Sequence, residues 1–124
     1  MNIGNNRKTL VLGASPNPER YGYKAVQKLA EADIPVVAVG TRPGQIGSVT
    51  IRTDQPKETG VDTVSLYVGP AHQPDLYEYI LSLKPRRIIM NPGTENPELM
   101  ELANKAGIEV EVACTLVLLA TKQF

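Results

Sequence analysis

The sequence T-L-V-L-G-A-S-P-N-P-E-R-Y-G-Y runs from Thr9 to Tyr23 and leads into a helical pattern from Lys24 to Ala32. Thr9 to Leu12 is a short apolar run that suits a buried strand, and Gly13 ends it. The small, turn-forming residues that follow predict a loop that leads into a helix. A strand, loop and helix in this order direct free backbone N–H groups and the positive end of the helix dipole toward one point. Phosphate commonly binds at such a point, so this stretch predicts the place of an anionic ligand.

Beyond this stretch, apolar runs of strand length alternate with helical patterns. This alternation is typical of a parallel sheet covered by helices on both faces. We therefore expect a three-layer, Rossmann-like, doubly wound α/β fold that forms a single domain over residues 1–124. The expected strands are 9–12, 36–39, 49–52, 63–68, 87–90 and 108–112. The expected helices are 24–32, 70–83, 97–106 (with Asn96 as the N-cap) and 114–121, with a loop at 40–48 and one helical turn at 55–60.

Composition and charge limit the setting in which the chain works. Its 124 residues suit one domain, which at this size buries roughly two thirds of the surface that the unfolded chain exposes. The 13 basic residues balance the 13 acidic ones, so no overall field favours nucleic acid or an anionic membrane as a partner. The single Cys114 cannot form an intrachain disulfide, and no leader or run of about 18 apolar residues is seen. We expect a cytoplasmic protein.

The order of the elements predicts where the loops meet. Right-handed crossovers place the first strand near the centre of the sheet, with the chain running to one edge and then restarting on the other side. Ligands of such sheets lie at the carboxyl ends of the strands, where the strand order reverses. Four turn-rich segments are expected to converge there, namely residues 13–23, 40–45, 69–73 and 91–95.

The first loop differs from the dinucleotide fingerprint G-x-G-x-x-G, because the next glycine after Gly13 is Gly22. Pro16 and Pro18 remove two backbone donors and stiffen the loop, which argues against a close backbone wrap around a diphosphate. A preset loop that offers side chains fits better. The candidate side chains are Ser15, Asn17, Arg20 and Lys24. The alternative is a surface turn whose charged groups are merely solvated.

Gly40, Thr41 and Arg42 follow the second strand, where proteins that bind nicotinamide adenine dinucleotide usually carry an Asp or Glu for the ribose hydroxyls. A guanidinium can instead bond a ribose phosphate, with each charge-assisted hydrogen bond contributing about 1.5 to 3 kcal/mol when partly shielded. Arg42 therefore favours a phosphorylated ribose, as found in coenzyme A at the 3′ position and in NADP at the 2′ position. The alternative is that Arg42 is a solvated loop cation.

The segment G-A-S-P-N-P-E-R-Y-G-Y-K-A-V at Gly13 to Val26, with V-V-A-V at the second strand, resembles the small stand-alone coenzyme A-binding proteins of bacteria and archaea. Those proteins are similar to the nucleotide-binding domain of the succinyl-CoA synthetase alpha subunit. The resemblance covers nearly the whole chain, and G-A-S followed by N-P-x-R-x-x-Y-K is not a general Rossmann pattern. It implies binding of coenzyme A or an acyl-CoA, with no known catalytic role in most members.

The resemblance also implies which loops contact the ligand. In the family the first loop follows the diphosphate, and the loop after the second strand approaches the ribose phosphate and adenine. Relatives carry Asn-Pro before the basic residue of that second loop, and their fourth loop is also different from the one here. Residue patterns and resemblance together give these expected cofactor-binding residues: Gly13, Ala14, Ser15, Asn17, Arg20, Tyr23, Lys24, Thr41, Arg42, Val68, Gly69, Pro70, Asn91, Pro92 and Gly93.

We expect no catalytic or metal-binding group. His72, the single histidine, has no evident partner that would make it a general base, and a solvated or capping role is expected. Cys114 matches a position where relatives often hold a cysteine, and its apolar neighbours favour a buried, inert thiol. The alternative is a thiol near the ligand, able to form a mixed disulfide with coenzyme A. One Cys and one His cannot by themselves form a zinc site.

The leading hypothesis is therefore a non-catalytic module that binds coenzyme A or an acyl-CoA. A second hypothesis is an NADP-binding subunit of an oxidoreductase or epimerase, although the chain shows no Tyr-x-x-x-Lys pair and no second domain. A third is an assembly partner that keeps the fold without the ligand. The apolar tail from Leu116 to Ala120 also allows a homodimer, and a tail that closes over the sheet is equally compatible with the sequence.

Overall fold

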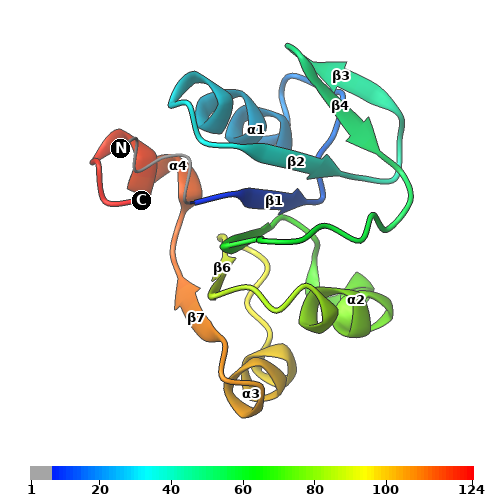
Figure 1. The fold of residues 1–124 in the computed structure, drawn as a ribbon, viewed down its shortest axis with the longest axis vertical. Helices are drawn as coiled ribbons and strands as arrows, with labels where there is room; N and C mark the ends of the chain where they lie inside the picture. Colours follow the sequence, from blue (N-terminus) through cyan, green and yellow to red (C-terminus); the bar gives the residue numbers. More distant parts are fainter. Residues whose placement is uncertain (1–6) are drawn as a thin grey trace.

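In the computed structural model, which describes residues 7–124, a sheet of seven strands has the order β3-β4-β2-β1-β5-β6-β7 (Figure 1). The first strand lies at the centre, as expected. The chain passes from it to one edge and then returns to the other side of β1. The strands are β1 (Thr9–Leu12), β2 (Val36–Val39), β3 (Gly44–Ile46), β4 (Val49–Arg52), β5 (Thr63–Leu66), β6 (Arg87–Met90) and β7 (Glu109–Val112).

The central strands end at the same level. Strand β1 pairs in parallel with β2 and β5, and this register places Leu12 beside both Val39 and Leu66. Strand β6 continues the parallel pairing, with Met90 beside Leu66. Because neighbouring carboxyl ends are level, the loops that leave them emerge together at one edge of the sheet.

Helices cover both faces of the sheet and produce three layers (Figure 1). Val26 and Leu29 pack on one face with Val11 and Ala38, and Leu119 covers the same core. Residues of the second and third helices pack on the other face with the apolar side chains of β5 and β6. The helices are α1 (Tyr21–Glu31), α2 (Tyr77–Ser82), α3 (Pro97–Lys105) and α4 (Thr115–Ala120), and the 3-10 turns η2 (Pro70–His72) and η3 (Pro74–Leu76) precede α2.

The predicted fold class, a three-layer Rossmann-like α/β domain, is confirmed. Asn96 is the N-cap of α3, and its side chain accepts from the backbone N–H of Glu98. No helix in the described part of the chain combines the length and the apolar character needed to cross a membrane.

Three local predictions were wrong. Residues 40–48 contain strand β3, which pairs antiparallel with β4 through a two-residue turn at Gly47 and Ser48. Residues 55–60 form no helical turn, because this stretch is held in an irregular path where the Tyr79 hydroxyl donates to the Pro56 carbonyl at 2.7 Å. The helix expected at 70–83 is divided into η2, η3 and α2, since Pro74 begins a new turn.

Candidate ligand-binding crevice

A crevice of about 910 Å³ opens at the carboxyl ends of the central strands. All four segments that were expected to converge contribute to its lining. A fifth segment, which the sequence did not indicate, joins them after β4. The lining from this segment is Thr53, Asp54 and Gln55.

Glycines allow the first loop, α1 and the second loop to meet backbone against backbone. A Cβ on Gly22 would lie 2.4 Å from the carbonyl oxygen of Gly13, and one on Gly40 would lie 2.1 Å from the carbonyl oxygen of Ala14. Real Cβ atoms do not approach that closely, so any other residue would push these segments apart. Gly13 itself has a φ of +101°, which favours glycine. The close contact brings the beginning of α1 and the Arg42 loop to the same crevice.

The first loop is shaped by its own side chains. The Ser15 hydroxyl accepts from the Asn17 backbone N–H at 3.1 Å, and the Asn17 side-chain oxygen accepts from the Glu19 N–H at 3.0 Å. Among the described residues, no side chain caps the N-terminus of α1, which begins after Arg20. The first N–H groups of a helix have no partner within the helix, so they remain available to a ligand.

Two guanidinium groups line the crevice on the side of the first and second loops. Arg20 and Arg42 are exposed and line the crevice, and within residues 7–124 neither forms an ion pair. Asp54 also lines the crevice, but it is paired with Arg52 through oxygen–nitrogen distances of 2.7 and 3.0 Å. The hydrogen bonds from Arg52 hold the pKa of Asp54 below its usual range. The wall formed by the first two loops is therefore positively charged.

The opposite wall is held by buried amide groups. Gln73 is fully buried and donates to the carbonyl oxygens of Val68 and Thr94, both at 2.8 Å. Its own oxygen accepts from Asn96 at 2.8 Å, and Asn96 also donates to the Tyr77 hydroxyl at 2.7 Å. This network joins the third loop to the fourth and fixes the width of the crevice between them.

Asn91 belongs to a second buried network rather than to the crevice lining. It is 0% exposed, and its amide nitrogen donates to the Ser65 hydroxyl at 3.0 Å and to the Leu66 carbonyl at 2.9 Å. Its oxygen accepts from the Thr115 N–H at 2.8 Å. Every polar group of Asn91 is therefore occupied by the protein, and its role in the structure is to join β5, β6 and α4.

Tyr67 follows β5 and lines the crevice, and its hydroxyl is buried without a hydrogen-bond partner in the described structure. The nearby hydroxyls of Ser65 and Thr115 bond to each other at 2.7 Å. Burial raises the pKa of Tyr67 to about 12. The group therefore stays neutral at physiological pH.

The structure places most of the expected residues around the crevice. Those that line it are Gly13, Ala14, Ser15, Asn17, Arg20, Thr41, Arg42, Val68, Gly69, Pro92 and Gly93. Four others do not. Tyr23 and Lys24 line a separate groove, because they lie on another side of α1 than Tyr21 and Gly22; Pro70 lies outside the lining, and Asn91 is buried.

Other crevice residues were not among the expected cofactor-binding residues. His72 and Asp75 line it from η2 and η3, Tyr67 from the end of β5, and Thr94 from the fourth loop. His72 was assigned a solvated or capping role, and its exposed position beside the crevice adds a polar group there. No group of three His, Cys, Asp or Glu side chains arranged to hold a metal ion occurs among residues 7–124.

Comparison with known proteins identifies the family of the chain. Residues 7–120 match the CoA binding domain family, and the chain belongs to that family. No curated protein matched the chain significantly.

Solved structures share the fold. A crystal structure of a protein described as uncharacterized is 47% identical, with a TM-score of 0.92 and coverage of 95% of this chain and 98% of that one. A protein from Thermus thermophilus is 22% identical, with a TM-score of 0.80 and coverage of 95% and 90%. A conserved hypothetical protein from Pyrococcus furiosus is 25% identical, with a TM-score of 0.72 and coverage of 85% and 91%.

Proposed function

We propose that this chain binds coenzyme A or an acyl-CoA in the crevice and acts as a non-catalytic binding module. The observation that carries the proposal is the pair of exposed guanidiniums of Arg20 and Arg42, which stand without ion-pair partners in the described structure beside the uncapped beginning of α1. Coenzyme A carries a diphosphate and a 3′-phosphate. The N–H groups of the helix and Arg20 suit the first, and Arg42 suits the second.

The remaining chemistry of the crevice supports binding more than catalysis. Asp54 is held by Arg52 as an anion, so it is not poised to exchange a proton with a substrate. The third and fourth loops are fixed by amides whose hydrogen bonds are used within the protein, and Gly69 and Gly93 are among the residues that they contribute to the crevice lining. Such small residues let an extended pantetheine arm lie close to the backbone.

Calorimetric titration of the protein tests the proposal, with coenzyme A, 3′-dephospho-coenzyme A and NADPH as ligands. We expect coenzyme A to bind, and the dephospho form to bind about tenfold to a hundredfold more weakly, because the charge-assisted bonds to Arg42 are lost. Replacing Arg42 by Met should make the affinities for coenzyme A and for its 3′-dephospho form nearly equal. Tighter binding of NADPH would favour the oxidoreductase or epimerase alternative.

The matched control is Lys105→Met. It removes the same unit of charge from an exposed side chain of α3 that lies outside the crevice and, within residues 7–124, pairs only with Glu101, at 3.2 Å. This variant should keep the difference between the two coenzyme A forms. Equal affinities of the unaltered protein for both forms would remove Arg42 from its proposed role, and absence of binding by all three ligands would overturn the proposal.

A further inference from the structure

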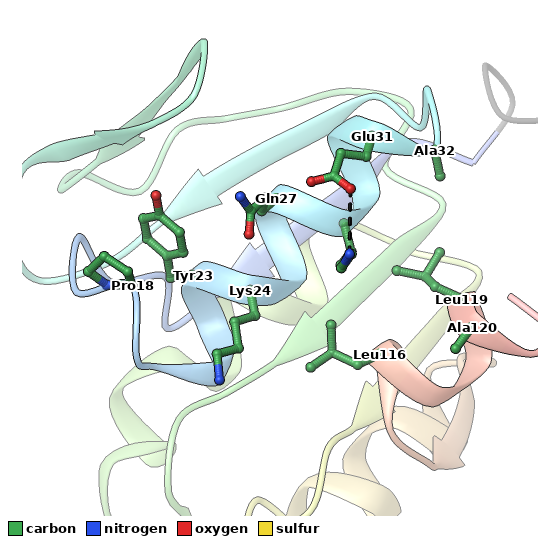
Figure 2. A pocket seen from close by; sticks show the side chains of 10 residues that line it. Pro18, Tyr23, Lys24, Gln27, Glu31, Ala32, Leu116, Leu119 and Ala120 are labelled. Carbon is green, nitrogen blue, oxygen red and sulfur yellow. Dashed lines mark ion pairs between the residues drawn. The ribbon is translucent and has the colours of Figure 1, made fainter.

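A second hollow of about 690 Å³ lies between α1 and α4, on the sheet face that α1 covers (Figure 2). One wall is apolar and comes from Leu116, Leu119 and Ala120 of α4. The other wall is the polar outward side of α1, lined by Lys24, Gln27, Lys28 and Glu31, and Lys28 pairs with Glu31 at 3.5 Å. Figure 2 shows the α4 side chains directed toward α1 across this groove.

The groove adjoins the crevice. Asn17 lines the crevice and the next residue, Pro18, lines the groove. Tyr21 lines the crevice, and the Lys24 ammonium, which lines the groove, lies 5.3 Å from the centre of its ring. The short segment from Asn17 to Lys24 therefore contributes residues to both hollows.

The beginning of α4 lies at the same edge of the sheet. The Thr115 N–H donates to the Asn91 side chain at 2.8 Å, and Pro92 and Gly93, which follow Asn91, line the crevice. Leu116 comes directly after Thr115 and lines the groove. The apolar wall thus begins beside the fourth loop, on the side where a chain that leaves the crevice would emerge.

The dimensions of the groove suit a small apolar chain better than a protein partner. A volume of about 690 Å³ is in the usual range of small-molecule sites. Stable protein interfaces use about 20 to 30 residues a side, and this groove is lined by far fewer. The α1 segment from Lys24 to Glu31 spans about 12 Å at 1.5 Å per residue, which is enough for a hydrocarbon chain of medium length.

We propose, on the basis of the proposed coenzyme A binding, that the α1–α4 groove holds the acyl chain of a medium-chain acyl-CoA whose nucleotide lies in the crevice. The apolar side chains of Leu116 and Leu119 remove the methylenes from water, while Lys24 stands where the chain crosses from crevice to groove. The ligand class of the site is then a thioester of coenzyme A with an aliphatic chain.

Titration of the unaltered protein with coenzyme A and with its acetyl, butyryl, hexanoyl and octanoyl thioesters, all below micelle-forming concentrations, tests this proposal. We expect affinity to rise with chain length, with octanoyl-CoA binding at least about tenfold more tightly than acetyl-CoA, because each buried methylene favours binding. Replacing Leu116 by Glu should bring the ratio of these two affinities close to one. This series on the unaltered protein does not depend on the folding of any variant.

Val117→Glu is the matched control. Val117 is the next residue of α4, is 56% exposed and does not line the groove. A Glu at this position therefore adds a carboxylate to the same turn of α4 but outside the groove. This variant should keep the octanoyl to acetyl ratio. Circular dichroism and thermal melting of both variants establish that each is folded at the titration temperature.

The outcomes separate the two proposals. Binding of coenzyme A with no dependence on chain length would overturn the role of the groove and leave the proposed function standing. Failure of coenzyme A itself to bind would overturn both. Sedimentation velocity supplies the remaining outcome: a dimer of the free protein that Leu116→Glu dissociates and Val117→Glu does not would assign the groove to a second copy of this chain.

Discussion

The two walls of the crevice use similar polar residues in opposite ways. On the wall of the first and second loops, Arg20 and Arg42 are exposed and without ion-pair partners in the described structure. On the wall of the third and fourth loops, Gln73 and Asn91 are fully buried, and their amides are used by the protein. A polar residue at a strand end can therefore either recognise a ligand or hold the loops that do. Which of the two it does depends on whether its hydrogen bonds are already formed.

Asn91→Leu tests the wall formed by the third and fourth loops. It has the largest expected effect on the free energy of unfolding. The change removes the bonds of Asn91 to the Leu66 carbonyl and the Thr115 N–H and one of the two bonds of the Ser65 hydroxyl, which should lower the free energy of unfolding by about 3 kcal/mol in a urea titration. Asn104→Leu, on the exposed face of α3, should change it by less than about 0.5 kcal/mol. If the Asn91 variant kept its stability and lost coenzyme A binding instead, Asn91 would belong to the binding wall.

Arg20→Met tests the other wall. We expect the affinity for coenzyme A to fall about tenfold, which corresponds to about 1.4 kcal/mol, because a charge-assisted contact to the diphosphate is lost. The free energy of unfolding should stay the same, since the guanidinium has no ion-pair partner within the described chain. Calorimetry and urea unfolding measure the two quantities, with Lys105→Met again as the control. A large loss of stability without a change in affinity would contradict the assignment.

The amino end of the sheet can be compared with both walls of the crevice. Its charged groups are paired with each other. Burial alone would raise the pKa of Asp62, but hydrogen bonds from Arg86 and Thr63 hold that pKa below its usual range. A carboxyl whose pKa is lowered on folding stabilises the protein above its unfolded pKa of about 3.9, and this contribution disappears as the pH falls through the folded pKa.

Asp62→Asn should therefore lower the free energy of unfolding by about 1 kcal/mol at pH 7, and the difference from the unaltered protein should vanish at strongly acidic pH. Urea titrations across this range measure it. Glu101→Gln, which removes an exposed ion pair with Lys105, should cost less than about 0.5 kcal/mol at pH 7. A difference for Asp62→Asn that grew on acidification would show that the sign of the pKa shift is wrong.

Most of the fold could be predicted because its signals are local. The apolar runs at residues 9–12, 36–39 and 87–90 match the observed strands, and Asn96 with Pro97 marks the beginning of α3. The missed strand β3 also had a local signal, since Gly47 and Ser48 form a two-residue hairpin turn between Ile46 and Val49. That signal was hidden within a stretch rich in glycine, which favoured a loop.

The site was less predictable than the fold. Whether a polar side chain is free to bind a ligand depends on whether residues distant in the sequence already form hydrogen bonds with it. Asn91 follows a strand, as a ligand contact would, but its amide is used by Ser65 and Thr115, which lie 26 and 24 residues away. Asp54 and Gln55 enter the crevice only because β4 is parallel to β2 and ends at the same edge. Neither the occupied amide of Asn91 nor the position of Asp54 and Gln55 follows from the order of residue types along the sequence.

Tyr67 follows β5 and lines the crevice, and replacing it by Phe has the smallest expected effect. Its hydroxyl is buried with no partner in the described structure, so its removal should leave the free energy of unfolding unchanged or raise it by about 0.5 kcal/mol. Tyr79→Phe is the matched control, because that hydroxyl donates to the Pro56 carbonyl at 2.7 Å and its loss should cost about 1 kcal/mol. Urea unfolding at pH 7 measures both, since burial raises the pKa of each tyrosine to about 12 and both are neutral there. If Tyr67→Phe instead weakened coenzyme A binding, the hydroxyl would find its partner in the ligand, and the binding wall would extend to Tyr67.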